Sequence, residues 1–307
     1  MSYENFTKFD DLFMANKRQD TQATLAPGAY ELKYNPDMDQ VFFKEIDIHH
    51  DEIVDLPSKE FQLATTQIKG FTDPKTRKAF DKYGFLYKRS FLFHGLHGTG
   101  KTILVDRIAE HMIQENAIVL FNPSPAYLAK GFEALTDIQP NTPVVVIFEE
   151  LDQLMDRFED DLLHLLDGEI QRDNVVYIAT TNFIKNVPAR ILRPGRFSTV
   201  IEVKFPDVKA RTAYLKAKLK LNANNVQLKT WVKKTKGLSI DEIKETVLSV
   251  KCLGCDLDEV INRINETKKL CKHDRIWDGY EHHADVVAEE STLSRSQMRG
   301  LLQQSNR

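Results

Sequence analysis

Apolar and polar residues alternate along the chain in a way that predicts strands and helices in turn. Between residues 55 and 205, short apolar runs are separated by stretches whose apolar residues recur at helical spacing. The apolar runs lie near residues 90–94, 117–121, 143–148, 175–180 and 199–203. Because such alternation is typical of parallel sheets with helices on both faces, we expect an α/β fold with a five-stranded parallel sheet. Ligands of such sheets bind at the carboxyl ends of the strands.

The first 54 residues have a different pattern. Residues 1 to about 26 are polar and lack sustained periodicity, which predicts a flexible arm. Residues 29–34 and 40–46 have strand-like patterns on either side of Asn35-Pro36-Asp37-Met38-Asp39, whose composition is typical of a turn. We therefore expect an N-terminal arm followed by a β-hairpin that leads into the α/β core.

Strand signals stop after the α/β core, which we place at residues 55–207. Residues 208–271 have the spacing of helices and predict a small helical lid. Within it, Ser239 and Glu242 have the spacing of a capping box at the start of a helix. Residues 272–307 are mostly polar and predict a tail with a possible helix near its end.

Composition limits the classes of protein that these elements can form. The 307 residues carry a formal net charge of −3 with interspersed signs, so no basic footprint indicates nucleic-acid or membrane binding. No apolar stretch approaches the roughly 20 residues that cross a bilayer, and the N-terminus lacks the pattern of a signal peptide. An odd number of cysteines, three, fits a reducing compartment. We expect a soluble, cytoplasmic protein.

The most informative motif is a phosphate loop, GLHGTGKT, which follows the first apolar run directly. It consists of Gly95, Leu96, His97, Gly98, Thr99, Gly100, Lys101 and Thr102, and Ile103 opens the next helix. Glycines let backbone N–H groups close around phosphate oxygens, the lysine adds a positive charge, and the threonine hydroxyl can bind Mg²⁺. A chance glycine turn before a helix is the alternative, but the strand, lysine and hydroxyl are all present. We expect a bound nucleoside triphosphate, ATP with Mg²⁺.

Two carboxylates supply the second half of the chemistry. Glu149 and Glu150 follow the apolar run 144–148, as in a Walker B element. We expect Glu149 to bind Mg²⁺ through its water shell and Glu150 to polarise the water that attacks the phosphate. An ordinary acidic loop at a strand end would look the same in isolation.

Polar residues after the next strand complete the candidate site. Asn182 ends the run 175–181 and can donate to a γ-phosphate or hold the attacking water, although most such asparagines are turn residues. Arg193 and Arg196 follow in a loop that contains Pro194. Arginines so placed can neutralise charge on a transferring phosphoryl group, also from a neighbouring subunit. Alone, they would be read as solvated surface side chains.

In this order and spacing, the elements resemble the AAA ATPases, and especially their branch of protein unfoldases and remodellers. The stretch from Leu165 to Gly168, VVYIATTN, ILRPGRF and the following FPD are similar to the second region of homology of that branch. The resemblance covers roughly residues 55–250. The stretch KYGFLYKRSFLFHGLHGTGKT is also similar to the ATPases that translocate an iron–sulfur subunit in mitochondria, whose membrane span is missing from this chain.

The resemblance implies a P-loop NTPase fold with a helical lid, and a role for each matching residue. It implies that Lys101 and Thr102 contact the nucleotide and Mg²⁺, that Glu149 is the acidic residue at the metal, and that Glu150 is the catalytic base. It also implies that Asn182 senses the γ-phosphate as sensor 1 and that Arg193 and Arg196 are arginine fingers for a neighbouring subunit. Tyr83 and Gly84 would lie against the adenine. Two departures stand out. Glu149 replaces the usual aspartate, and Leu96-His97 replaces the usual proline pair.

The resemblance also places a substrate-gripping loop after the second strand, within residues 122–132. Either Tyr127 or Phe132 could be the aromatic residue that contacts polypeptide, and each could equally be part of the core.

A possible zinc site is discounted. Cys252, Cys255, Cys271 and His273 have acceptable ligand spacing, but the first pair lies between two predicted helices, where small residues form a turn.

Together, these patterns predict an ATP-hydrolysing protein that forms a ring, a hexamer by resemblance, and remodels a protein partner. Two alternatives stay open. A nucleic-acid motor or loader could use the same phosphate chemistry, and Glu149 with the substituted phosphate loop would suit a nucleotide-dependent scaffold with little turnover.

Overall fold

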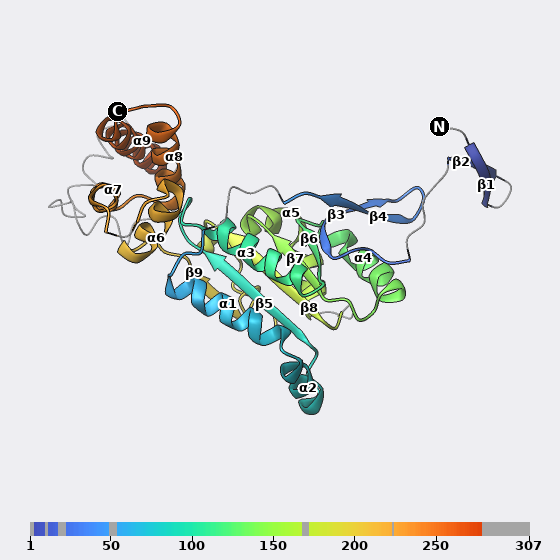
Figure 1. Cartoon of the computed structure of the whole chain (residues 1–307). Helices are drawn as coiled ribbons and strands as arrows, with labels where there is room; N and C mark the ends of the chain where they lie inside the picture. Colours follow the sequence, from blue (N-terminus) through green and yellow to red (C-terminus); the bar gives the residue numbers. More distant parts are fainter. Residues whose placement is uncertain are drawn as a thin grey trace, which may run out of the picture. The chain divides into compact units, whose positions relative to one another are not determined.

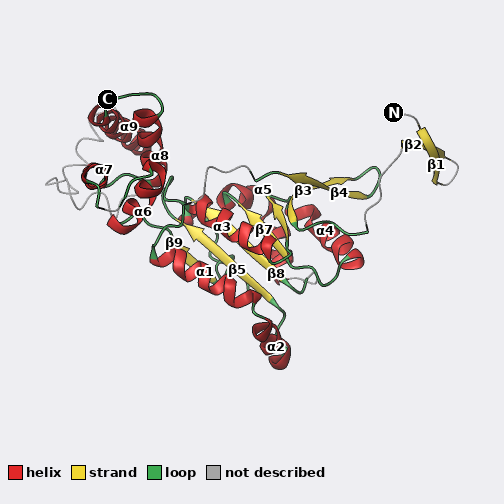
Figure 2. Cartoon of the chain, in the orientation of Figure 1, coloured by secondary structure: helices red, strands yellow, loops and turns green. Residues whose placement is uncertain are grey.

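The computed structural model describes residues 3–9, 12–17, 23–48, 54–167, 172–222 and 224–277 (Figures 1 and 2). By its internal contacts the chain divides into two compact units, Met1–Glu245 and Thr246–Arg307. This division falls inside the predicted lid, residues 208–271, whose limits remain a prediction. Most of the predicted tail, residues 278–307, lies outside the described residues.

The first unit is built on a seven-stranded sheet in the order β4-β3-β6-β7-β8-β5-β9. Its strands are β3 (Gly28–Asn35), β4 (Gln40–Ile46), β5 (Lys88–His94), β6 (Ile118–Phe121), β7 (Val144–Phe148), β8 (Val175–Thr181) and β9 (Thr199–Glu202). The five strands from β6 to β9 are parallel. They lie where the apolar runs predicted them, so the α/β class and the parallel core are confirmed.

The central strands are buried on both faces. Every residue of β7 and β8 is buried, and both strands consist almost entirely of apolar residues except for the threonines that end β8. Continuous apolar runs are what a doubly covered parallel strand requires. Polar residues therefore begin only at the carboxyl ends of these strands, with Glu149 after β7 and with Thr180, Thr181 and Asn182 at the end of β8.

The N-terminal hairpin is part of this sheet, which corrects the expectation of a five-stranded sheet with a separate hairpin. β3 pairs antiparallel with β4 and parallel with β6, from Gly28↔Ile118 to Tyr30↔Leu120. Leu32 is buried, and its side chain lies against Gly131 of the neighbouring helix. The hairpin thus covers an edge that β6 would otherwise expose, and unpaired edges are costly.

Two strands lie within the segment before residue 26, for which the sequence predicted a flexible arm without regular structure of its own. β1 (Tyr3–Phe9) and β2 (Leu12–Lys17) form a separate two-stranded antiparallel sheet, in which Phe9 pairs with Leu12. Apolar residues recur within both strands, but not over a stretch long enough to have shown sustained periodicity in the sequence.

Among the described residues, five α-helices lie between the strands along the sequence. They are α1 (Lys59–Thr72), α2 (Pro74–Tyr83), α3 (Lys101–Gln114), α4 (Pro125–Ile138) and α5 (Leu151–Asp167), of which α3, α4 and α5 pack on the sheet. α3 connects β5 to β6 in one direction along the sheet, whereas α4 and α5 connect strands in the opposite direction. Because parallel crossovers are right-handed, α3 lies on one face and α4 and α5 lie on the other. α1 packs on α3, and α2 packs on α1.

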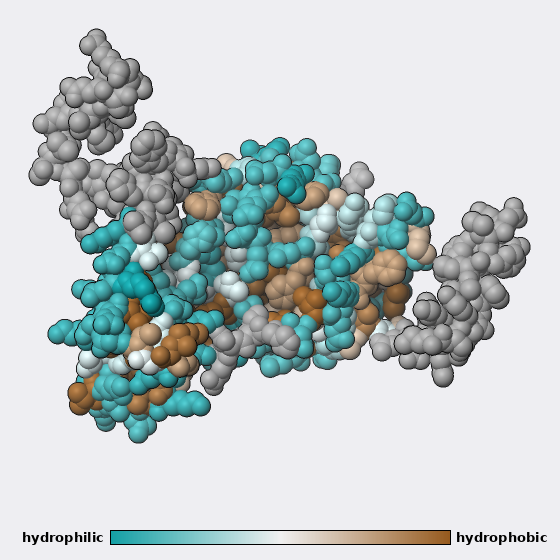
Figure 3. Space-filling view, turned by 90° about the horizontal axis from the view of Figure 1, so that it is seen from above, coloured by the Kyte–Doolittle hydropathy of each residue, from teal (hydrophilic) through white to brown (hydrophobic). Residues whose placement is uncertain are grey.

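Helices follow the sheet as predicted. They are α6 (Val208–Leu219), α7 (Val226–Lys234), α8 (Ile240–Lys251) and α9 (Leu257–Trp277). The capping box is confirmed, because the Ser239 N–H donates to Glu242 Oε2 (2.7 Å) and the Glu242 N–H donates to Ser239 Oγ (3.2 Å). Among the described residues, none of the helices has the length and apolar content to span a bilayer. Hydrophilic residues cover most of the described surface seen from above, with apolar residues in small groups (Figure 3).

We predict that Leu32→Ala lowers the free energy of unfolding of the core by about 2 to 5 kcal/mol, because it leaves a cavity against α4. Urea unfolding followed by fluorescence measures this change. Phe42→Ala, at an exposed position of the same hairpin, is the control and should change stability little. Equal, small effects of both substitutions would contradict the placement of β3 in the core.

Candidate nucleotide site

A pocket of about 360 Å³ opens at the carboxyl ends of the parallel strands. It is lined by His97, Gly98, Gly100, Lys101, Thr102, Ile103, Asn122, Glu149, Glu150, Thr180, Asn182 and Asp241. Residues predicted from three separate motifs therefore meet at one place. The lining is polar and contains the start of α3, which is the arrangement that binds phosphate groups.

The phosphate loop needs its glycines for two different steric reasons. Gly95 has φ 154°, and a Cβ there would lie 2.3 Å from the carbonyl oxygen of Val203. Gly98 has φ 74°, and a Cβ there would lie 2.7 Å from Ser239 Oγ. The first contact sets the loop against the strand after the arginine loop. The second brings the start of α8 onto the phosphate loop.

That second contact is also a backbone contact. The N–H groups of Ile240 and Asp241 both donate to the carbonyl oxygen of Gly98, at 2.8 and 3.3 Å. Asp241 thereby joins the pocket, and its carboxylate faces the same space as Lys101. The first turn of α8 is therefore a wall of the nucleotide site.

Lys101 is buried within the loop. Its Nζ donates to the carbonyl oxygens of Gly95 (2.8 Å) and Leu96 (2.9 Å). Burial lowers the pKa of this amine, while the charges of Asp241 and Asp152 act in the opposite direction. An anionic ligand would supply the negative charge that a buried ammonium group favours.

The two substituted loop residues lie at the surface. Leu96 and His97 are both exposed, and the His97 ring is 5.8 Å from the Phe183 ring in an edge-on arrangement. His97 thus spans from the phosphate loop to the residue after Asn182. His97 is also one of the residues that line the pocket.

The predicted metal ligands face each other. The Thr102 hydroxyl donates to Glu149 Oε1 at 3.4 Å, and the Glu149 N–H donates to Asn122 Oδ1 at 2.7 Å. Hydroxyl and carboxylate oxygens at the β-phosphate end of a phosphate loop are the donors that Mg²⁺ prefers. The extra methylene of Glu149, relative to aspartate, lets its carboxylate reach Thr102 directly. These residues fit a hydrated Mg²⁺ ion.

Glu150 is held in an unusual backbone conformation. Its φ is 52°, in the left-handed region that a glutamate rarely adopts, and its N–H donates to Thr180 Oγ1 (3.3 Å). Its Oε2 accepts a hydrogen bond from Gln153 Nε2 at 2.7 Å. The carboxylate is thus oriented by one oxygen, and the other oxygen remains to contact a water molecule.

A buried carboxyl group lies behind the metal ligands. Asp106, on α3, is buried, and desolvation raises its pKa to about 7, with further contributions from the charges of Glu149 and Glu110. No sequence pattern marked this residue, since a charged side chain in an amphipathic helix is normally placed on its solvent face.

The two predicted arginine fingers are in different situations. The Arg196 guanidinium pairs with Asp167 and donates to the carbonyl oxygen of Arg190 (2.6 Å). Arg193 is exposed, and within the described part of the chain it has no ion pair. Neither arginine lines the pocket of its own chain.

Tyr83 and Gly84 do not lie at the nucleotide site, which corrects that prediction. They end α2 just before the amino end of β5, whereas the phosphate loop follows the carboxyl end of the same strand. The residue that lies against the loop is Leu56, whose Cδ1 is 3.5 Å from an ideal Cβ on Gly100. Leu56 precedes Pro57 at the entry to α1, and this apolar–proline pair was the signal that could have identified it.

Sequence reasoning also missed Asn122, Thr180 and Asp241 in the pocket lining. Asn122 follows β6 as Asn182 follows β8, so its position at a strand end was a readable signal. Thr180 is inside a strand and Asp241 is in a helix far along the chain, and neither had one.

The structure distinguishes the two candidate substrate aromatics. Phe132 is only 2% exposed and belongs to the hydrophobic core, so it is not available to a substrate. Tyr127 is 41% exposed and its ring lies against that of Tyr34 in β3, with centroids 4.9 Å apart and the planes tilted by 31°. α4 begins at Pro125, which leaves only Asn122–Ser124 as a loop after β6.

The described residues contain no group of three or more potential metal-binding His, Cys, Asp or Glu side chains. Cys252 is exposed and Cys255 is half-buried. The side chains of Cys271 and His273 are not among those described, so the expectation about zinc stays a prediction.

We predict that Gly98→Ala weakens nucleotide binding at least about tenfold, because the added methyl group would collide with Ser239 Oγ in a strained backbone conformation. Titration with a fluorescent ADP analogue measures this. Gly70→Ala, where no atom lies within 4 Å of the new methyl group, is the matched control. Unchanged affinity in Gly98→Ala would show that the loop is not tightly packed against α8.

Comparison with known proteins agrees with this site. Residues 91–205 match the family model described as "ATPase family associated with various cellular activities (AAA)". A proteasome-activating nucleotidase of Saccharolobus solfataricus is 29% identical over 227 residues, which are 62% of this chain and 56% of the relative. A proteasome-activating nucleotidase of Methanococcus maripaludis is 25% identical over 256 residues, 73% of this chain and 58% of the relative.

Protein CdcH of Halobacterium salinarum is 29% identical over 184 residues, 54% of this chain and 22% of the relative. The chain therefore spans a little over half the length of the two nucleotidases and less of the third relative. The matched segment begins inside β5 and ends after β9, so it contains the phosphate loop, both glutamates, Asn182 and both arginines. Through this segment, the chain is similar to the AAA ATPases.

Proposed function

We propose that this protein hydrolyses ATP within a ring of identical subunits, a hexamer, and uses the resulting motion to remodel a polypeptide partner. One observation carries the proposal. The pocket brings together a phosphate loop, two carboxylates and Asn182, but among the described residues no arginine lines it. Arg193 lies exposed elsewhere on the same chain, so a second copy can complete the site.

The chemistry follows from the residues of the pocket. Lys101 and the N–H groups of the loop bind the phosphates, and a Mg²⁺ ion at Thr102 and Glu149 would neutralise charge between the β- and γ-phosphates. Glu150, oriented by Gln153, accepts a proton from the attacking water. Asn182 is suitably placed at the strand end to hold that water or the γ-phosphate.

The trans contribution is assigned to Arg193 rather than to both arginines. Arg196 is engaged by Asp167 and the Arg190 carbonyl oxygen, so its role is to keep the loop in shape. The exposed guanidinium of Arg193 stabilises charge on the phosphoryl group that a neighbouring subunit transfers.

A polypeptide is the preferred partner for two reasons. Two similar proteins have names that refer to activation of the proteasome. In this chain, the exposed Tyr127 lies on the helix that follows Asn122, a residue of the nucleotide pocket. Tyr127 is therefore our candidate for the aromatic contact with substrate.

A scaffold with slow turnover is the second candidate. The hydrogen bond from Gln153 to Glu150 Oε2 favours it. If Oε2 is the oxygen that must contact the attacking water, this hydrogen bond has to break before hydrolysis, and turnover is then slow.

We predict that Glu150→Gln lowers the rate of ATP hydrolysis by at least about a hundredfold while ATP still binds, because the substitution removes the base but keeps the shape. Phosphate release and equilibrium binding of a fluorescent ATP analogue measure the two effects. Gln153→Ala is measured in parallel. A lower rate of hydrolysis would indicate that Gln153 orients the base, and a higher rate would indicate that it restrains the base. Unchanged hydrolysis in Glu150→Gln would favour the scaffold.

We predict that Arg193→Ala strongly lowers the rate of ATP hydrolysis but retains nucleotide binding. In mixtures, the variant subunits should also lower the ATPase rate of wild-type subunits. The physical reason is that the missing guanidinium belongs to a neighbour's site. The measurement is ATPase rate against the fraction of mutant subunits. Lys229→Ala, a change to an exposed cation on α7, is the control. A linear dilution of activity, with a rate per subunit independent of protein concentration, would refute trans completion.

A further inference from the structure

The segment from α2 into β5 carries a group of basic side chains. Residues 74–89 contain six basic side chains and one acidic side chain, in a chain whose formal net charge is −3. No residue of α2 is buried. Lys75, Lys78 and Lys82 are all exposed, and their spacing of three and four residues places them on one side of the helix.

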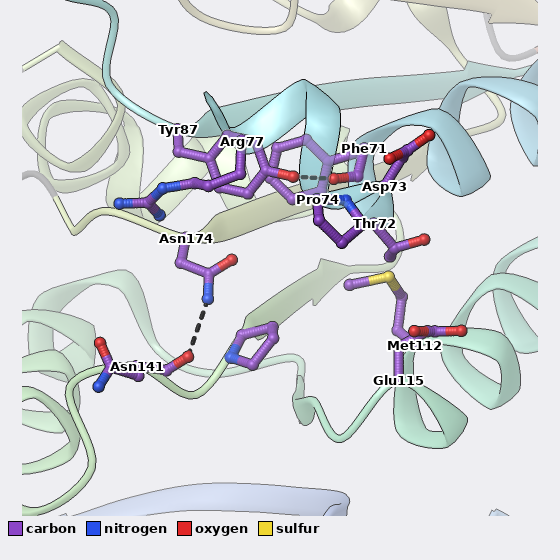
Figure 4. Close-up of a pocket in the computed structure, with 11 residues that line it drawn as sticks. Phe71, Thr72, Asp73, Pro74, Arg77, Tyr87, Met112, Glu115, Asn141 and Asn174 are labelled. Carbon is purple, nitrogen blue, oxygen red and sulfur yellow. Dashed lines mark hydrogen bonds between the residues drawn. The ribbon is translucent and has the colours of Figure 1, made fainter. Parts of the chain in front are cut away.

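This helix is firmly attached despite its exposure. Arg77 forms ion pairs with Asp173 and Asp81, and its guanidinium lies 4.9 Å from the centre of the Tyr87 ring. Tyr87 in turn stacks on Phe71 and donates a hydrogen bond to the Phe71 carbonyl oxygen (Figure 4). Arg77 thus anchors α2 to the core and leaves the three lysines on a preorganised surface.

Two aromatic side chains continue this surface. Tyr83 is 67% exposed and Phe85 is 68% exposed, and they flank Gly84, which ends α2 in the left-handed conformation. Large apolar side chains with so much exposure, next to a group of like charges, are typical of a surface that another macromolecule covers.

The complementary surface is on the same chain. α5 contains six acidic side chains and one basic side chain between Leu151 and Asp167. Glu159 and Asp160 pair with Arg190, and Asp167 pairs with Arg196. Asp156, Asp160 and Asp161 are exposed. α4 packs beside α5 and ends at Ile138, which is 61% exposed and offers an apolar contact on this side.

Within one molecule α2 does not pack on α5, although Lys88 of β5 donates to the carbonyl oxygen of Leu166 in α5 at 2.6 Å. α2 packs on α1, which packs on α3, and α3 lies on the opposite face of the sheet from α4 and α5. Contact between two different patches of identical chains is heterologous and produces a ring when the rotation closes. Arg196 is tied to α5 through Asp167, and its loop is also tied to α5 through the Arg190–Glu159 ion pair, so contact through α5 would bring the arginine loop toward a neighbour.

We propose that α2 with Tyr83 and Phe85 docks on the acidic α5 surface of a second copy of this chain, and that this contact sets which way subunits face in the assembly. The inference rests on the proposed ring and adds the surfaces that form it. A membrane is a poorer occupant, because α2 has no apolar face. Single-stranded nucleic acid could also use lysines and aromatics, and it is distinguished by the experiment.

The experiment reverses charge on each surface separately. One variant carries Lys75→Glu, Lys78→Glu and Lys82→Glu, and the other carries Asp156→Lys, Asp160→Lys and Asp161→Lys. The control reverses three exposed lysines elsewhere, with Lys229→Glu, Lys233→Glu and Lys236→Glu. Light scattering measures mass with ATP and Mg²⁺ present, and circular dichroism and nucleotide binding verify that each variant is folded.

We expect each reversed variant alone to assemble at least about tenfold more weakly than wild type, because like charges then face each other, while the control assembles normally. An equimolar mixture of the two reversed variants should recover paired subunits, since each presents one native and one reversed surface. Replacement of the same lysines by glutamine should give a smaller loss that vanishes at high salt.

Assembly of the α2 variant at wild-type strength would overturn the inference and leave the proposed ring intact. A wild-type protein that stays monomeric at all concentrations would instead overturn the ring. Binding of a labelled single-stranded oligonucleotide that is lost in the α2 variant, with assembly unaffected, would assign the surface to nucleic acid and also overturn the inference.

Discussion

Parallel pairing of β5 with β8 is the constraint on which the site depends. The two strands pair over their whole length, from Lys88↔Val175 to His94↔Thr181, so both reach the same edge of the sheet. The phosphate loop leaves β5 at that edge, and Asn182 leaves β8 beside it. β7, paired with β8 on the other side, delivers Glu149 and Glu150 to the same place. A one-residue slip in this pairing would turn each of these groups away from the pocket.

The same edge joins the phosphate site to the helices that follow the sheet. Gly98 is at once a phosphate-loop glycine and the acceptor for two N–H groups of α8. Because its carbonyl oxygen and its missing side chain are both used in this contact, the loop cannot rearrange around a ligand without disturbing the start of α8. Ligand state and helix position are therefore coupled by a short backbone contact rather than by a long chain of side chains.

Much of this arrangement could be predicted because it is local in sequence. Buried parallel strands give continuous apolar runs, and a phosphate loop is eight consecutive residues, so both could be predicted from the sequence. The pairing of β3 with β6 was not, because it joins Gly28 to Ile118 and a half-buried strand has the same pattern at any edge. The prediction that Tyr83 lies at the adenine was wrong for a related reason. Tyr83 is near the phosphate loop in the sequence, but the whole length of β5 separates the two in space. Asp241 was not predicted as part of the site, because it lies in a helix far along the chain and an aspartate in the first turn of a helix is common.

One further consequence follows from the length of α8. The helix has 12 residues, which corresponds to about 18 Å, and its first residue, Ile240, donates to the carbonyl oxygen of Gly98. A straight rod of this length acts as a lever. A tilt of about 3° at the phosphate loop displaces the far end by about 1 Å, so small movements around a nucleotide become amplified where α8 ends.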